Sequence, residues 1–113
     1  MDILLDNGTP RGIARFLEGH TVREARELGW DQLKNGELLD AAEAAGFGIF
    51  ITTDKNIRHQ QNLGFRHVAI IVLGSGRWTQ VKLYIENVRK AVSEIASGGF
   101  IEVAMPLVRR TDE

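Results

Sequence analysis

The sequence predicts an α/β fold with a mostly parallel sheet of four to five strands. Short, uniformly apolar runs at residues 3–5, 47–51 and 68–73 lack the alternation of a half-exposed strand, and they are rich in β-branched side chains. Parallel strands that are covered on both faces have this composition. Segments with helical spacing of apolar residues lie between the runs, and such an alternation is typical of a parallel α/β sheet.

The first half of the chain contains two predicted helices and one ambiguous segment. Thr-Pro at residues 9–10 combines a capping hydroxyl with proline at the first helical position, which predicts a helix from there. Residues 20–22 fit a short strand, while residues 22–28 also fit a partly helical segment, so both interpretations stay open. The next helix is expected over residues 35–45.

The second half contains the clearest helix of the sequence. Apolar residues recur there at i, i+3, i+4 and i+7, which predicts an amphipathic helix over residues 79–96. Two glycines end this helix, and residues 100–103 are expected to form the last strand. Residues 56–62 are polar and fit a short helix.

Length, charge and composition exclude several classes of protein. The 113 residues suit one domain, expected over residues 1–105 and followed by a tail at 106–113. The 14 basic and 15 acidic residues give a net charge of −1, which excludes a wholesale basic coat for nucleic acid. Without cysteine there are no disulfides, thiolate zinc sites or cysteine nucleophiles. The sequence shows neither a long apolar run nor a signal peptide, so we expect a cytoplasmic location and no membrane partner.

Two of the predicted strands are followed by an aspartate. Asp6 comes directly after the first run, and Asp54 follows the second run after two threonines. Sites in open α/β sheets form beyond the carboxyl ends of the strands, so two central strands would bring both carboxylates into one crevice. Such a pair repels unless a cation or a proton lies between them, and Mg²⁺ suits a few carboxylates with retained waters and phosphate oxygens. A helix cap at Asp6 and a turn at Asp54 are the alternative interpretation.

A third acid is present in the helix predicted over residues 35–45. At about 100° per residue, Glu37 flanks the apolar arc of this helix in its first turn. It is therefore the acid best placed to reach inward near a helix end. A surface acid favoured by the helix dipole is the alternative interpretation.

Several polar residues near these acids have the chemistry to contact a phosphodiester backbone. Arg11 lies at the start of the first predicted helix, where free backbone N–H groups also favour anions. Lys55 follows the second aspartate directly, and Arg58 lies one turn further. Gln61 belongs to a run of three amides, which bind bases or phosphate or fix a loop. Solvated surface cations are the alternative interpretation of the basic residues.

The ordered set of motifs resembles a family of small bacterial PIN-like proteins. The opening resembles the family's LLDENLP motif, and the segment that ends at Trp30 resembles its vrelGw motif. The resemblance covers about residues 1–105, which is nearly the whole chain. The matching segments, in order, are ILLDNGTP (3–10), RELGW (26–30), NGELL (35–39), AAGF (44–47), FITTDKN (50–56), QQNL (60–63) and AIIVL (69–73).

This family is similar to PIN-domain ribonucleases, which include the VapC-type toxins of toxin–antitoxin pairs. The resemblance implies a Rossmann-like three-layer α/β/α sandwich whose acidic cluster binds Mg²⁺ or Mn²⁺ and hydrolyses single-stranded RNA. It assigns the acid after the first strand to Asp6, the acid of the middle helix to Glu37 and the acid of the T-x-D motif to Asp54. It also implies a cognate antitoxin and a homodimer as partners.

The leading hypothesis is therefore a metal-dependent ribonuclease, and two alternatives stay open. Asn7 stands where the family often has an acid, and no carboxylate occurs between Asp54 and Glu86. This reduced set of acids motivates the first alternative, a PIN-like module that binds RNA or a protein partner without cleavage. The second alternative is a receiver-like phosphoacceptor domain, but such domains usually carry a lysine before the proline that corresponds to Pro106.

Overall fold

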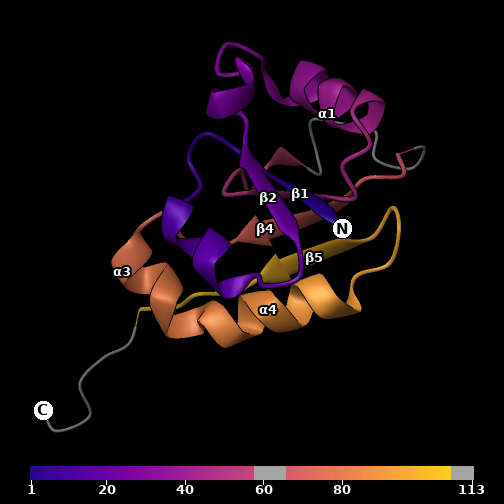
Figure 1. The fold of residues 1–113 in the computed structure, drawn as a ribbon. Coiled ribbons are helices and arrows are strands. Elements are labelled where there is room, and N and C mark those ends of the chain that lie inside the picture. The colour runs from indigo at the N-terminus through magenta and orange to yellow at the C-terminus, as the bar shows by residue number, and fades with distance from the viewer. Residues whose placement is uncertain (58–65, 108–113) are drawn as a thin grey trace, which may run out of the picture.

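The computed structural model describes residues 1–57 and 66–107, and it contains one five-stranded sheet (Figure 1). All strand pairs are parallel, and the strands lie in the order β2-β1-β3-β4-β5. The predicted α/β class and parallel sheet are confirmed. The strands are β1 (Asp2–Leu5), β2 (Thr21–Glu24), β3 (Ile49–Thr52), β4 (Ala69–Leu73) and β5 (Phe100–Val103).

The three central strands are covered on both faces, whereas the two edge strands are not. Every residue of β3 and β4 is buried, which explains their uniformly apolar sequences. The edge strand β2 alternates between exposed and half-buried residues. The ambiguous segment at 20–28 therefore contains both predicted forms, because β2 is followed by a single 3₁₀ turn, η2 (Arg26–Leu28).

Helices cover both faces of the sheet and give a three-layer arrangement (Figure 1). One face packs against α1 (Asn35–Ala44), through residues that include Leu4, Phe50, Ile70, Leu38 and Leu39. The other face packs against η1 (Arg11–Phe16) and α4 (Ile85–Glu94), through residues that include Ile3, Ile49, Ile71, Ile13 and Val88. Full burial of each such side chain is worth about 1.5–3 kcal/mol, so these two clusters hold the layers together.

Two predicted helices differ from the structure. The segment after Pro10 forms the 3₁₀ helix η1 rather than an α-helix. Gly12 packs closely there against Trp78, since a Cβ at Gly12 would lie 2.9 Å from Trp78 Cε2. The helix predicted over 79–96 is divided into α3 (Trp78–Val81), η3 (Lys82–Tyr84) and α4. The short helix predicted over 56–62 lies mostly outside the described residues.

Side chains beside the break between η3 and α4 form hydrogen bonds to the segment that follows β5. Tyr84 has a non-helical backbone, with φ −115° and ψ 21°, and its hydroxyl donates to Pro106 O at 2.6 Å. The buried amide of Gln80 donates to Met105 O at 2.9 Å and to Pro106 O at 2.7 Å. These bonds tie the chain to the domain through Pro106, which is one residue beyond the predicted boundary.

Within the described residues, no helix has the length and apolarity needed to cross a membrane. The longest described helices, α1 and α4, have 10 residues each. A span of the hydrocarbon core needs about 20 apolar residues.

Removing the Gln80 amide should destabilise the fold. In a Gln80→Ala variant the buried Met105 carbonyl loses its side-chain donor, and we expect a loss of about 1–3 kcal/mol in the free energy of unfolding. Urea denaturation measures this change. Thr79→Ala, at the exposed neighbouring position, is the matched control and should lie within about 0.5 kcal/mol of wild type. Equal midpoints for the two variants would contradict the role of Gln80.

Candidate functional site

The strand order creates a topological switch point between β1 and β3. From β1 the chain continues outward to β2 on one side, and β3, β4 and β5 follow on the other side. In open α/β sheets this point leaves a crevice at the carboxyl ends of the strands, where ligands bind. Asp6 directly follows β1, and Asp54 follows β3 by two residues, so both predicted acids lie at the switch point.

The register of β1 and β3 decides which way their final side chains face. Leu5 pairs with Ile51, and both belong to the core cluster on the α4 side. Because successive side chains of a strand alternate between faces, Asp6 and Thr52 face the α1 side together.

Thr52 joins the two halves of the site. Its fully buried hydroxyl donates to Asp6 Oδ2 at 2.7 Å and accepts from the Asp54 backbone N at 3.1 Å. The other carboxylate oxygen of Asp6, Oδ1, accepts from the Asn7 N at 2.8 Å. Asp54 Oδ1 accepts from the Asn56 N at 2.9 Å. One buried hydroxyl therefore fixes the carboxylate of Asp6 and the backbone at Asp54.

The loops after β1, β3 and β4 touch one another at the switch point. A Cβ at Gly76 would lie 3.2 Å from Gly8 O and 3.5 Å from Thr53 Cγ2. The loop after β1 is also held from within, because Thr9 Oγ1 donates to Ile51 O at 3.1 Å. Close backbone approach, which small glycines permit, thus holds these three loops together at the carboxyl ends of the strands.

The structure does not place the Glu37 side chain at the switch point between β1 and β3. Its exposed side chain lies in the first turn of α1, where Oε1 accepts from the Lys34 N at 3.4 Å. Within residues 1–57 and 66–107, no group of three or more His, Cys, Asp or Glu side chains is placed to hold a metal ion. The structure therefore links the Asp6 carboxylate to the backbone of Asp54 through Thr52, while the metal-ligating roles of Asp6, Glu37 and Asp54 stay predictions.

The oxygen atoms at the switch point suit a hard divalent cation. Asn7 Oδ1 is buried beside Asp6 and has no hydrogen-bond partner among the described residues. Each carboxylate oxygen of Asp6 accepts one bond and keeps a further lone pair for a ligand. Mg²⁺ and Mn²⁺ prefer carboxylate, carbonyl and water oxygens, and Mg²⁺ is often held by one or two carboxylates. The donor set therefore fits the predicted cation.

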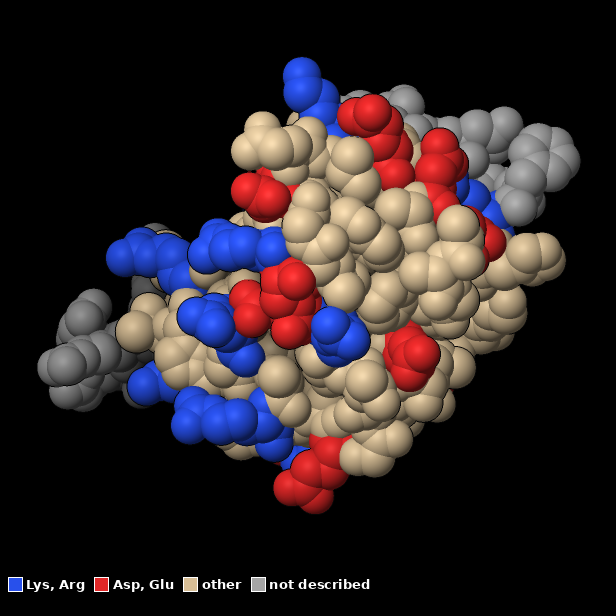
Figure 2. Space-filling view, turned by 45° about the horizontal axis from the view of Figure 1, so that its top comes forward, with Lys and Arg blue, Asp and Glu red and all other residues tan. Residues whose placement is uncertain are grey.

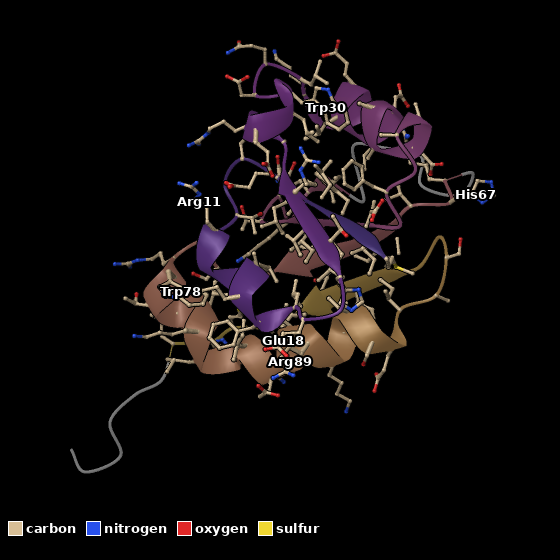
Figure 3. The ribbon with its side chains drawn as sticks, viewed as in Figure 1. Arg11, Glu18, Trp30, His67, Trp78 and Arg89 are labelled. Carbon is tan, nitrogen blue, oxygen red and sulfur yellow. The ribbon has the colours of Figure 1, made fainter. Side chains whose placement is uncertain are left out.

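Basic side chains gather on the side of the molecule where the carboxyl ends of the strands lie. Figure 2 shows Lys and Arg gathered on the side toward which β4 and β5 point in Figure 1. Arg11 projects outward from the start of η1 (Figure 3), is 79% exposed, and places its Nε 3.0 Å from Glu24 Oε2. Lys55 is exposed and lines a cavity beyond the ends of β4 and β5. Arg58 and Gln61, the other two predicted substrate contacts, lie outside the described residues.

Arg11 and Arg23 each form an ion pair with a glutamate on or beside β2. The N–H of Glu24 donates to Glu27 Oε1 at 2.7 Å, and this bond is the main cause that lowers the pKa of Glu27. Arg23, whose Nε lies 3.3 Å from the same oxygen, lowers it further. The stabilisation that this pKa shift represents is complete at neutral pH and is lost as the pH falls through the lowered pKa.

The rings of the two tryptophans pack within the domain. The Trp30 ring lies edge-on to Phe47 with centroids 6.1 Å apart, and the Trp78 ring is 6.0 Å from Phe16. Both are partly buried against the core clusters, and they lie on opposite faces of the sheet (Figure 3).

Sequence reasoning identified Asp54 but missed Thr52. The signal was present, because a hydroxyl residue stands two positions before the aspartate and at the end of a buried strand. The role of Thr52 becomes visible only when the register of β1 and β3 is known. This register places Thr52 one position beyond the Leu5–Ile51 pair and beside Asp6.

Comparisons of this chain with protein-family models, with curated proteins and with solved structures found no match. The strand order and the geometry at the switch point are therefore the features that point to a function, and the PIN-like resemblance stays an expectation.

Removing the Thr52 hydroxyl should weaken cation binding. Thr52→Val keeps the shape of the side chain but leaves Asp6 Oδ2 and the Asp54 N–H without this partner, so we expect Mn²⁺ affinity to fall about 10- to 100-fold. Thr52→Ser, which keeps the hydroxyl, should retain the wild-type affinity. Isothermal titration calorimetry measures both. Equal affinities for Thr52→Val and Thr52→Ser would exclude this role.

Proposed function

We propose that this chain is a metal-dependent ribonuclease whose Mg²⁺ or Mn²⁺ is held by Asp6 and Asp54. The observation that carries the proposal is the Thr52 hydroxyl, which bonds both to the Asp6 carboxylate and to the backbone of Asp54 at the switch point. When bound there, such a cation would lower the pKa of a water and offset the negative charge that builds on a phosphodiester during hydrolysis.

The chain's own residues supply orientation and charge. Asp6 receives one hydrogen bond on each carboxylate oxygen, so its rotamer is fixed before any ligand arrives. Preorganised charge of this kind costs no rearrangement during the reaction. Lys55, which directly follows Asp54, and Arg11 at the start of η1 are the proposed contacts to the phosphodiester backbone. Arg58 and Gln61 complete this proposed set.

RNA as substrate, and a toxin role, are parts of the proposal that rest on the PIN-like resemblance. The gathering of Lys and Arg near the strand ends supports a polyanionic substrate (Figure 2). The net charge of −1 implies that RNA contacts this local surface and not the whole molecule. A cognate antitoxin and a homodimer are the corresponding proposed partners.

A second candidate function is binding of RNA or a protein without cleavage. It is favoured by one observation, which is that no group of three or more acids in the described part of the chain is placed to hold a metal ion. Two carboxylates repel each other less than three and bind a cation more weakly, so a module of this kind would keep the crevice and lose turnover.

Neutralising Asp54 should abolish cleavage. Asp54→Asn removes one negative charge from the proposed cation site, and we expect Mg²⁺-dependent cleavage of single-stranded RNA to fall by at least about 100-fold. Glu37→Gln should cost less activity, because the Glu37 carboxylate lies at the start of α1 and accepts from the Lys34 N. Cleavage of a fluorescently labelled RNA with and without EDTA measures both variants.

The fold of each variant is checked by circular dichroism, and Glu18→Gln, an exposed acid in the loop before β2, serves as the charge-matched control. Equal cleavage by Asp54→Asn and wild type would remove Asp54 from the mechanism. Saturable RNA binding without any Mg²⁺-dependent cleavage by wild type would favour the binding module.

A further inference from the structure

A cavity of about 410 Å³ lies beyond the carboxyl ends of β4 and β5, beside the proposed cation site. Its volume is within the range of pockets that hold small ligands, which is about 300–1,000 Å³. Lys55 links the cavity to the proposed cation site, because it lines the cavity and directly follows Asp54 in the sequence. The lining includes Lys55, Val72, Gly74, Glu102, Val103 and Pro106.

The sheet register puts this cavity in line with the switch point. Thr52 pairs with Val72, and Val72 pairs with Glu102, so the three residues form one row across β3, β4 and β5. Paired residues of neighbouring strands face the same side of the sheet, which here is the α1 side. Neighbouring strands lie about 4.8 Å apart, which puts the backbone of Glu102 roughly 10 Å from that of Thr52. One nucleotide spans a comparable distance from its phosphate to the outer edge of its base.

Two charged side chains at the cavity are not used by the domain itself. Glu102 and Lys55 are both exposed, and the side chain of neither forms a hydrogen bond or an ion pair with any residue in the described ranges. Around them the lining is apolar, with Val72, Val103 and Pro106. The cavity thus offers an acceptor, a cation and an apolar wall, which is the combination that orients a planar polar ligand.

We propose that this cavity is a subsite for a guanine base of the RNA substrate, a refinement that rests on the ribonuclease function proposed above. The Watson–Crick edge of guanine presents two neighbouring N–H donors, N1–H and N2–H, which match the two oxygens of the Glu102 carboxylate. The Lys55 ammonium contacts the adjoining phosphate, and the exposed ring of Pro106 packs against the base. The other bases lack this pair of neighbouring donors.

Guanosine and inosine monophosphates test the subsite directly, since inosine lacks only the 2-amino group. We titrate each into the wild-type protein with Ca²⁺ present and follow backbone amide shifts by NMR. The expected result is saturable shifts at residues 72–74 and 102–106, with the guanine nucleotide bound about 10-fold more tightly than the inosine nucleotide. Equal affinities, or no saturable shifts at these residues, would overturn the proposal.

Variants separate the two recognition elements. Glu102→Gln should abolish the preference for guanine over inosine, whereas Lys55→Gln should weaken both nucleotides and leave their ratio unchanged. Glu18→Gln, which lies in a different cavity with His20 and Arg89, is the charge-matched control and should change neither affinity. A preference that survives in Glu102→Gln would also overturn the proposal, and it is the result expected if Glu102 only protects the sheet edge from pairing.

Failure of the subsite is distinguishable from failure of the proposed function. Guanine-selective binding without Mg²⁺-dependent cleavage of any RNA would support the subsite and contradict the nuclease. Cleavage that is equally fast beside guanosine and beside inosine in otherwise identical RNAs would contradict the subsite and leave the nuclease intact.

Discussion

The hydroxyl of Thr52 joins the Asp6 carboxylate to the backbone of Asp54 at the candidate site. It donates to the Asp6 carboxylate and accepts from the Asp54 backbone, and it is itself fully buried at the end of β3. Its direction follows from the parallel register of β1 and β3, which turns Asp6 and Thr52 to the same face. Packing of the apolar strands therefore determines the placement of the acids.

The same sheet geometry extends the site beyond these acids. The row of Thr52, Val72 and Glu102 crosses three strands on one face, and the cavity at its far end opens beside Lys55. The proposed cation site and the proposed base subsite therefore lie along a single edge of the sheet. Rigid strands hold the side chains of this row, and the loops after β1, β3 and β4 support one another through close glycine contacts.

The sequence predicted the features that depend on local pattern and missed those that depend on distant contacts. Apolar runs predicted parallel strands, and an aspartate after two of them predicted a shared crevice. Gly12 of the 3₁₀ helix η1 packs against the distant Trp78, and the break before α4 coincides with the bond of Tyr84 to Pro106. The role of Thr52 depends on a partner 46 residues away, which no local pattern reveals.

An NMR titration of the wild-type protein with Mg²⁺ tests the central claim most directly. Saturable amide shifts that centre on Asp6, Thr52 and Asp54 are the predicted result, because the cation would bind oxygens that share the Thr52 hydroxyl network. Mn²⁺ should broaden the same resonances. An absence of saturable shifts at these residues below about millimolar Mg²⁺, with the fold intact, would contradict a cation site at the switch point.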